Sequence, residues 1–260
     1  MKLPLYQVDA FSDRSFSGNP AAVVPLERWL DDRTLQSIAN ENNLAETAFF
    51  VREPDGYRIR WFTPQVEVDL CGHATLASAH VLFEFLDHGA THVTFASRSG
   101  PLEVAQEAGR LVLDFPAKPG HRLDPPAGFA SALGAEPREL LEAMDWMAVF
   151  ETEDEVRALK PDLRALAKFD TRGVIATAPG GDVDFVSRFF APRVGVDEDP
   201  VTGSAHCMLV PFWAGRLERA SLRARQISAR GGELWCELRG DRVKIAGHAA
   251  LYLQGTITIP

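Results

Sequence analysis

The chain has 260 residues, of which 46% are hydrophobic and 24% charged, as in ordinary soluble proteins. With 27 basic and 36 acidic side chains its net charge is −9, which opposes nucleic-acid binding. Its three cysteines form no CxxC pair. No signal peptide opens the sequence, and no apolar run is long enough to cross a membrane. We therefore expect a reduced, cytoplasmic protein of one large domain or two ordinary ones.

The first part of the chain is expected to form strands around one apolar helix. An early helix should begin at Asp31 or Asp32, which are good N-cap residues, and end at Asn42 and Asn43. A second helix should follow Gly72, and its few polar residues are typical of a buried helix. The expected strands cover residues 3–11, 21–25, 44–51, 57–62, 91–97 and 102–115, with turns at 54–56 and 108–109.

The later part of the chain shows a similar pattern. Residues 116–134 contain four prolines and are expected to form a linker. Further strands are expected over residues 146–150, 174–177 and 183–190 and from 222 to the C-terminus, with helices at 162–168 and around 208–213. Because strands outnumber helices and each half has one apolar helix, we expect an α+β fold with a sheet curled around a helix.

Two internal sequence repeats indicate a duplication. Residues 60–69 and 188–197 are identical at six of ten positions, with an offset of 128. Residues 99–113 resemble residues 231–245 at an offset of 132. A period this long indicates two similar domains, because solenoid repeats are much shorter. We expect an N-terminal half over 1–115, a linker over 116–134 and a C-terminal half over 135–260.

The two apolar helices are expected to begin at equivalent glycines, Gly72 and Gly203. If the halves pack face to face, both helix starts would point into a shared cleft. Helix N-termini offer unpaired N–H groups and a positive partial charge, which bind a carboxylate well. Ordinary helix capping explains the same residues about equally well.

Three titratable residues are candidates for acid–base chemistry. Glu46 interrupts an apolar strand, where burial would suit it to proton transfer, although a solvated carboxylate on an edge strand is the simpler reading. His73 adjoins a helix N-terminus and is expected to be neutral. It could equally be a structural histidine near the core helix whose ring nitrogens are hydrogen-bonded. Asp199 could cap the second helix or face Glu46 and His73 across the cleft.

Cys71 could be a reactive thiolate, because a helix N-terminus lowers the pKa of a thiol. Aligning the two glycines places Thr202, not a second cysteine, at the equivalent position. A metal site made of Cys71, His73, His206 and Cys207 lacks standard zinc spacing, so we expect no metal. Nucleotide-binding motifs are absent from the sequence.

The sequence resembles the phenazine biosynthesis-like (PhzF-like) isomerases, relatives of diaminopimelate epimerase. The resemblance covers nearly the whole chain, and it is carried in order by VDAF (8–11), FSGNPAA (16–22), NLAETAF (43–49), GHAT (72–75), DPVTGSA (199–205) and GH (247–248). It implies two similar halves, each a rolled mixed β-sheet around a central α-helix, with the active-site cleft between them. It also implies no cofactor, and usually a homodimer.

The resemblance also implies roles for individual residues. Glu46 would move the proton, with His73 and Asp199 as its polar partners. The substrate carboxylate would be held by residues of the same motifs, namely Asn19, Gly72, Gly203 and Ser204. The epimerase relatives use two cysteines, one in each half, whereas here Cys71 occupies one of these places and Thr202 the other. This favours an isomerase with a single carboxylate, in which Cys71 takes no part in the chemistry.

The sequence therefore predicts a cofactor-independent isomerase that acts on a small amino-acid-like or cyclic carboxylic acid. Two alternatives stay open: an epimerase or racemase of an amino acid, and a non-catalytic protein that uses the same cleft for binding. Exchange of solvent deuterium into a substrate would separate the two enzymes from the binding protein. Inversion at one centre without movement of a double bond would identify the epimerase.

Overall fold

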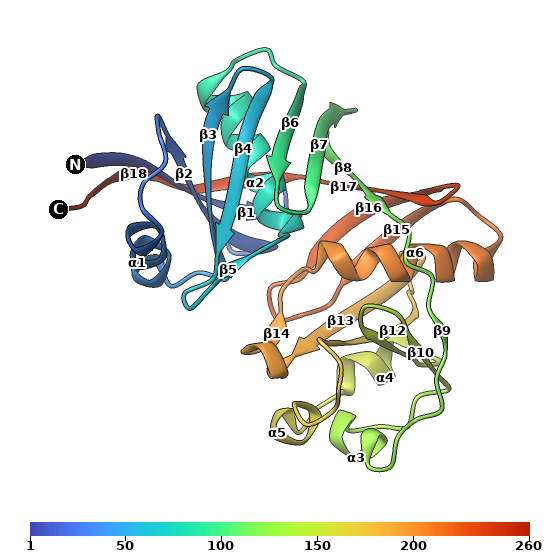
Figure 1. The fold of residues 1–260 in the computed structure, drawn as a ribbon. Coiled ribbons are helices and arrows are strands. Elements are labelled where there is room, and N and C mark those ends of the chain that lie inside the picture. The colour runs from blue at the N-terminus through green and yellow to red at the C-terminus, as the bar shows by residue number, and fades with distance from the viewer. The chain divides into compact units, whose positions relative to one another are not determined.

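The computed structural model describes all 260 residues, and contacts within the chain divide them into two units. The first unit comprises Met1–Asp114 and Ala246–Pro260, and the second comprises Phe115–Ile245. Figure 1 shows the chain coloured from its N-terminus to its C-terminus, with both termini in the first unit. None of the helices is both long and apolar enough to cross a membrane.

The first unit is a mixed sheet with two helices. Its strands pair in the order β18–β1–β2–β3–β4–β6–β7–β8. The short strand β5 pairs with the end of β4 that β6 does not reach. The β2–β3 and β4–β6 pairs are parallel and the others antiparallel. The strands are β1 (Lys2–Ala10), β2 (Asn19–Leu26), β3 (Glu46–Glu53), β4 (Gly56–Phe62), β5 (Glu67–Val68), β6 (His92–Ser97), β7 (Gly100–Glu107), β8 (Arg110–Pro116) and β18 (Ala249–Thr258).

Helix α1 (Asp32–Asn42) begins and ends where the sequence predicts. The Asp31 carboxylate accepts hydrogen bonds from the backbone N–H and the hydroxyl of Thr34, which caps the N-terminus. Asn43 adopts the left-handed conformation, with φ of 49°, and ends the helix.

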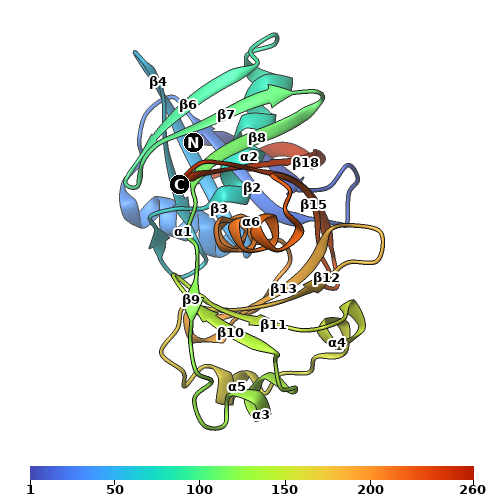
Figure 2. The same ribbon diagram turned by 90° about the vertical axis from the view of Figure 1, so that its right-hand side faces the viewer.

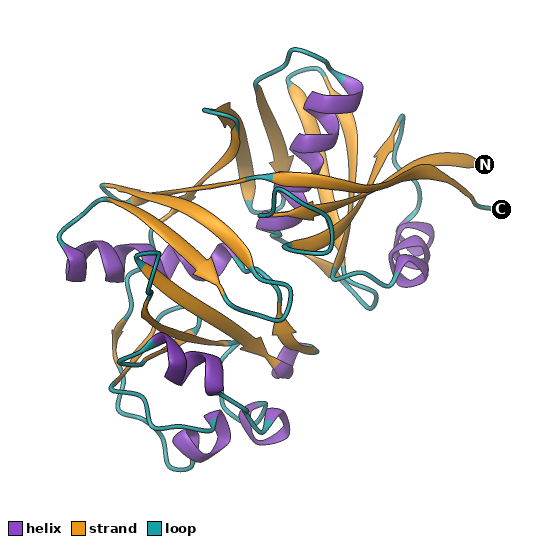
Figure 3. Ribbon diagram, turned by 180° about the vertical axis from the view of Figure 1, so that it is seen from behind, coloured by secondary structure: helices purple, strands orange, loops and turns teal.

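Helix α2 (Gly72–Val81) is the predicted apolar helix of the first unit, and it continues as a π-helical turn over Leu82–Leu86. Every residue from His73 to Ala79 is buried. The helix packs against β1, β2, β3, β7 and β18, and Figure 3 shows it flanked by strands. The predicted arrangement of a sheet around a buried helix is therefore present in this unit.

The second unit contains the other apolar helix, α6 (Gly203–Leu217), which packs against β15 and β16 (Figure 2). The Trp213 ring of α6 stacks on Phe185 of β13 with centroids 5.8 Å apart. The strands are β9 (His121–Arg122), β10 (Glu139–Glu142), β11 (Trp146–Val149), β12 (Val174–Pro179), β13 (Phe185–Ala191), β14 (Val196–Asp199), β15 (Ser221–Gln226), β16 (Gly232–Arg239) and β17 (Arg242–Gly247), which leads the chain back to the first unit. The shorter helices are α3 (Phe129–Leu133), α4 (Glu153–Ala158), α5 (Leu163–Leu166) and a 3₁₀ turn over Pro192–Val194.

The two units share one order of strand pairing. In the first unit β2 and β3 are parallel, β3 and β4 antiparallel, and β4 pairs with both β5 and the parallel strand β6. The second unit repeats these pairings. There β11 and β12 are parallel, β12 and β13 antiparallel, and β13 pairs with both β14 and the parallel strand β15. An apolar helix follows β5 in the first unit and β14 in the second. This repeated topology is what the internal sequence repeat predicts.

The repeat extends to side-chain contacts. The Arg60 guanidinium makes two hydrogen bonds to Glu67 and lies 5.1 Å from the Phe62 ring centroid. Arg188 likewise makes two hydrogen bonds to Glu198 and lies 4.8 Å from the Phe190 ring. The repeated Arg-x-Phe pattern therefore builds the same stacked ion pair in each unit.

Two predicted boundaries are wrong. The C-terminal residues do not belong to the second half, because β18 pairs with β1 from Ala10↔Ala249 to Lys2↔Thr258. Nor is 116–134 a linker, since Phe129 and Leu133 in this segment are fully buried in the core of the second unit. Helix α5 is shorter than predicted, and α4 was not predicted although Thr152 and Glu155 form its capping box.

Candidate active site

The first unit brings several predicted site residues together where two neighbouring strands begin. Glu46 begins β3 and Asn19 begins β2, and these strands are parallel neighbours with Ala21 opposite Glu46. Gly18 turns the chain into β2 with φ of +69°, and a Cβ there would lie 2.2 Å from the Ala10 carbonyl oxygen. Only glycine fits this turn, which places Asn19 at the start of the strand.

His73, in the first turn of α2, lies at the centre of this group. Its Nε2 is 3.2 Å from Glu46 Oε2, and its Nδ1 is 3.2 Å from Asn19 Nδ2. Cys71 Sγ is 3.5 Å from the same Nδ1. The His73 side chain is 7% exposed and that of Glu46 is 19% exposed. Because β3 lies between β2 and β4, the alternative of a solvated carboxylate on an edge strand is wrong.

The facing atoms of Glu46 and His73 have no other partner. Oε2 and Nε2 are both buried, and neither makes a hydrogen bond of good geometry, even to the other. A buried polar atom without a hydrogen bond costs free energy, and such atoms are found at functional sites. These two facing atoms therefore make Glu46 and His73 candidates for proton transfer.

The groups around His73 bear on the prediction that its ring is neutral. Burial disfavours the imidazolium ion, but the negative charges of Cys71 and Glu46 outweigh burial and raise the pKa of His73 well above its usual value. Burial raises the pKa of the Cys71 thiol, and the Glu46 carboxylate raises it further, although His73 opposes this. A neutral thiol brings no charge to the ring, so Glu46 is the group whose charge favours a proton on His73. This contact opposes the expectation of a neutral His73.

The N-terminus of α2 itself can bind an anion. Gly72 is the first residue of the helix, as predicted, and the N-cap residue Cys71 makes no side-chain cap hydrogen bond. The first N–H groups of a helix have no partner within the helix. They therefore provide donors for a carboxylate next to Glu46 and His73.

The second unit places Asp199 just before α6. The Thr202 hydroxyl donates a hydrogen bond of 2.5 Å to Asp199 Oδ2. The buried Gln226 amide holds the turn by donating to the Asp199 carbonyl and accepting from the Thr202 N–H. Asp199 lies in the second unit, so its action beside Glu46 and His73 stays a prediction.

Ser204 and Gly203 form the first turn of α6, as predicted. Ser204 Oγ accepts a hydrogen bond of 3.1 Å from Arg172, so the Ser204 proton is free to point elsewhere. Arg172 is held by two hydrogen bonds to Asp145, whose side chain is 2% exposed. The sequence analysis missed Arg172, Asp145 and Gln226, because nothing in the local pattern links these residues to the start of α6.

Two residues of the four-residue metal site that the sequence analysis set aside, His206 and Cys207, lie in the second unit. His206 Nδ1 is 2.9 Å from the Thr202 carbonyl oxygen, and burial lowers its pKa to about 4. Burial raises the pKa of Cys207 to about 12. A different group could hold a metal, since ligand atoms of Glu46, Cys71 and His73 all lie within 4.8 Å of one another.

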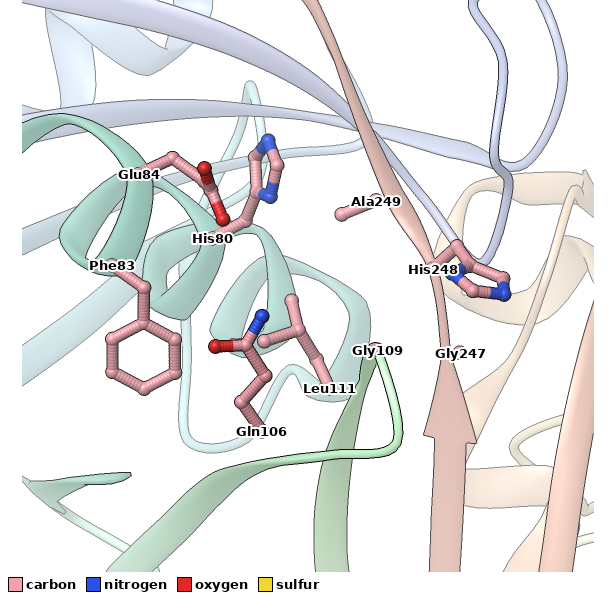
Figure 4. Close-up of a pocket in the computed structure, with 9 residues that line it drawn as sticks. All are labelled: His80, Phe83, Glu84, Gln106, Gly109, Leu111, Gly247, His248 and Ala249. Atoms are coloured by element: carbon pink, nitrogen blue, oxygen red, sulfur yellow. The ribbon is translucent and has the colours of Figure 1, made fainter. Parts of the chain in front are cut away.

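A separate cavity of about 150 Å³ lies in the first unit and contains none of the predicted site residues. Figure 4 shows that the Glu84 carboxylate and the His80 ring approach each other on one side of this cavity. Burial lowers the pKa of His80, although the charge of Glu84 opposes the shift. The remaining lining residues come from the β7–β8 hairpin and from the junction of β17 and β18.

A family model for phenazine biosynthesis-like proteins matches residues 8–255 of the chain. The chain belongs to this family. A relative from Pseudomonas aeruginosa, named an uncharacterized isomerase, is 58% identical to this phenazine biosynthesis-like protein over the full length of both. The prediction of an isomerase of this family is confirmed at that general level.

Solved structures support the fold. A crystal structure of a phenazine biosynthesis protein of the PhzF family from Enterococcus faecalis has a TM-score of 0.97 at 46% identity, covering 100% of both chains. A hydroxyproline epimerase from Agrobacterium vitis, with bound trans-4-hydroxy-L-proline, has a TM-score of 0.65 at 11% identity, covering 98% of this chain and 92% of that one. The second likeness shows the fold alone, and it confirms the mixed α+β class predicted from the sequence.

Proposed function

We propose that this phenazine biosynthesis-like protein is a cofactor-independent isomerase of a small carboxylic acid, with Glu46 as its acid/base. The observation that carries the proposal is the buried Glu46 Oε2, which has no partner except His73 Nε2, 3.2 Å away, beside the N-terminus of α2. A base for carbon needs a lone pair that can face the substrate. A carboxylate has several lone pairs, so contact with His73 alone leaves Glu46 others for this role.

In the proposed reaction, the Glu46 carboxylate takes a proton from a carbon of the substrate. The electron pair of the broken C–H bond moves into the substrate and shifts a double bond. The protonated Glu46 then returns the proton to a different carbon, so that substrate and product have the same atoms. A positioned acid/base contributes about 10² to 10⁴ in rate.

His73 would hold the Glu46 carboxylate in position and supply positive charge next to it. Asn19 would fix the ring from its other side, through the contact at Nδ1. The N–H groups at Gly72 would bind the substrate carboxylate. We expect Gly203, Ser204 and Asp199 to take part in substrate binding and catalysis, as the family resemblance implies, and we expect a homodimer.

A second candidate function is epimerisation with Cys71 as the base. The contact that favours it is the 3.5 Å separation between Cys71 Sγ and His73 Nδ1. A thiol must lose its proton to act as a base, and burial of Cys71 opposes that loss. This favours Glu46 as the base.

The proposal can be tested by incubating the protein with a panel of small carboxylic acids in D₂O. Mass spectrometry would detect deuterium on carbon, and NMR would identify the product. We expect exchange into at least one acid, with movement of a double bond. Inversion at a single centre would favour the epimerase instead. Acids that raise the melting temperature but never exchange would identify a binding protein.

A further inference from the structure

We propose that Glu46, Cys71 and His73 form a binding site for Zn²⁺. A thiol, an imidazole and a carboxylate are the three kinds of side chain that bind zinc in proteins. Two of these residues, Cys71 and His73, are buried, and the third is partly buried. The site does not depend on the proposed isomerase activity, because binding can be measured without turnover.

The ligand atoms lie close enough together for one zinc ion. Three atoms no more than 4.8 Å apart all lie within about 2.8 Å of a common centre, whereas zinc–ligand bonds are about 2.0 to 2.3 Å. Binding therefore requires a contraction of roughly half an ångström. It also requires the Cys71 side chain to turn, because Sγ now lies 3.5 Å from Nδ1 and must move toward Nε2. Two neighbouring N and O ligands of tetrahedral zinc are about 3.3 Å apart, and His73 Nε2 and Glu46 Oε2 are already 3.2 Å apart.

The ligand atoms are also available. Neither His73 Nε2 nor Glu46 Oε2 makes a hydrogen bond, although both atoms are buried. The other ring nitrogen, Nδ1, already contacts the buried Asn19 amide. A histidine that binds a metal through one nitrogen is typically fixed by a hydrogen bond at the other. Asn19 now faces Nδ1 with its amide nitrogen, so the amide would turn over to accept this hydrogen bond through its oxygen.

Zinc binding would release protons and leave one position open. The Cys71 thiol gives its proton to solvent as the Zn–S bond forms, and His73 gives up the proton on Nε2 as the Zn–N bond forms. A water molecule or a substrate oxygen takes the fourth position. Because the metal would occupy the Glu46 lone pair, bound zinc should block the proposed proton transfer, so Zn²⁺ would act as an inhibitor.

Co²⁺ provides a direct test, since it takes zinc sites and its bond to a thiolate produces a charge-transfer absorption band. The full-length protein should show this band at one equivalent of Co²⁺, and one equivalent of Zn²⁺ should remove it. Cys71→Ala should abolish the band. Competition with a chromophoric chelator should show that His73→Gln and Glu46→Gln weaken Zn²⁺ binding, by more than about 10-fold each.

The matched control is Cys236→Ala, which removes another buried cysteine, on β16 of the second unit. This variant should bind Co²⁺ as the wild type does. If Cys71→Ala does not fold, Cys71→Ser provides the same test with a smaller change in size and polarity. The proposal is wrong if the wild type shows no band, if the band survives the loss of Cys71, or if it depends on Cys236.

Discussion

Protonation of His206 should destabilise the protein in mild acid. This side chain is fully buried, its Nε2 has no hydrogen bond, and the Phe185 ring lies 5.9 Å away. Burial lowers its pKa from 6.5 to about 4. Because the unfolded chain binds the proton more tightly, the stability that neutral His206 provides is complete above pH 6.5 and is lost as the pH falls toward 4.

The size of the loss follows from these two pKa values. Between pH 7.5 and pH 5 the unfolded state gains a proton at this position and the folded state does not. The free energy of unfolding should therefore fall by about 2 kcal/mol through His206 alone. Carboxylates contribute little in this range because most of them titrate below pH 5.

Urea unfolding of the wild type and of His206→Gln at both pH values measures this loss. Glutamine keeps a donor for the Thr202 carbonyl but does not titrate. We expect the variant to be less stable at pH 7.5 and to lose about 2 kcal/mol less than the wild type on going to pH 5. Equal losses in both proteins would refute the reasoning, because they would show that His206 is not kept neutral by burial.

Two further predictions concern Gly18 and Ser204. Gly18→Ala should lower the free energy of unfolding by about 1 to 3 kcal/mol, since its Cβ would overlap the Ala10 carbonyl. Gly89→Ala shares the positive φ but meets no atom within 4 Å, so equal losses in urea unfolding would exclude this overlap as the cause. Ser204→Ala should weaken binding of a substrate or analogue, measured by calorimetry, more than it changes the melting temperature, because Arg172 keeps its two bonds to Asp145. Lower stability with unchanged binding would make Ser204 a helix cap only.

Local signals in the sequence predicted the parts of the fold that depend on near neighbours. Asp31 and Asn43 gave the ends of α1, and the apolar run after Gly72 gave the buried helix α2. Contacts between distant segments were not predictable in this way. The pairing of β18 with β1 joins residues almost a full chain apart. The alternation of apolar and polar residues along a strand does not identify the strand with which it pairs.

The same distinction holds for the site. The sequence motifs singled out Glu46, His73 and Asn19, and the structure places all three together. The contact between His73 and Glu46 was not predictable, because folding brings the carboxylate to the ring from a distant part of the chain. Arg172 was missed for a similar reason, since its contact with Ser204 spans 32 residues of chain.

The most direct test of the account compares variants of Glu46 and Cys71 on whichever acid the D₂O panel identifies. Glu46→Gln should reduce deuterium exchange by about 10² to 10⁴ while still binding a substrate analogue, because it keeps the size of the side chain and loses the base. Cys71→Ala should retain most of the exchange. Glu53→Gln, at the other end of β3, should match the wild type. The opposite ranking, with Cys71 essential and Glu46 dispensable, would contradict the account.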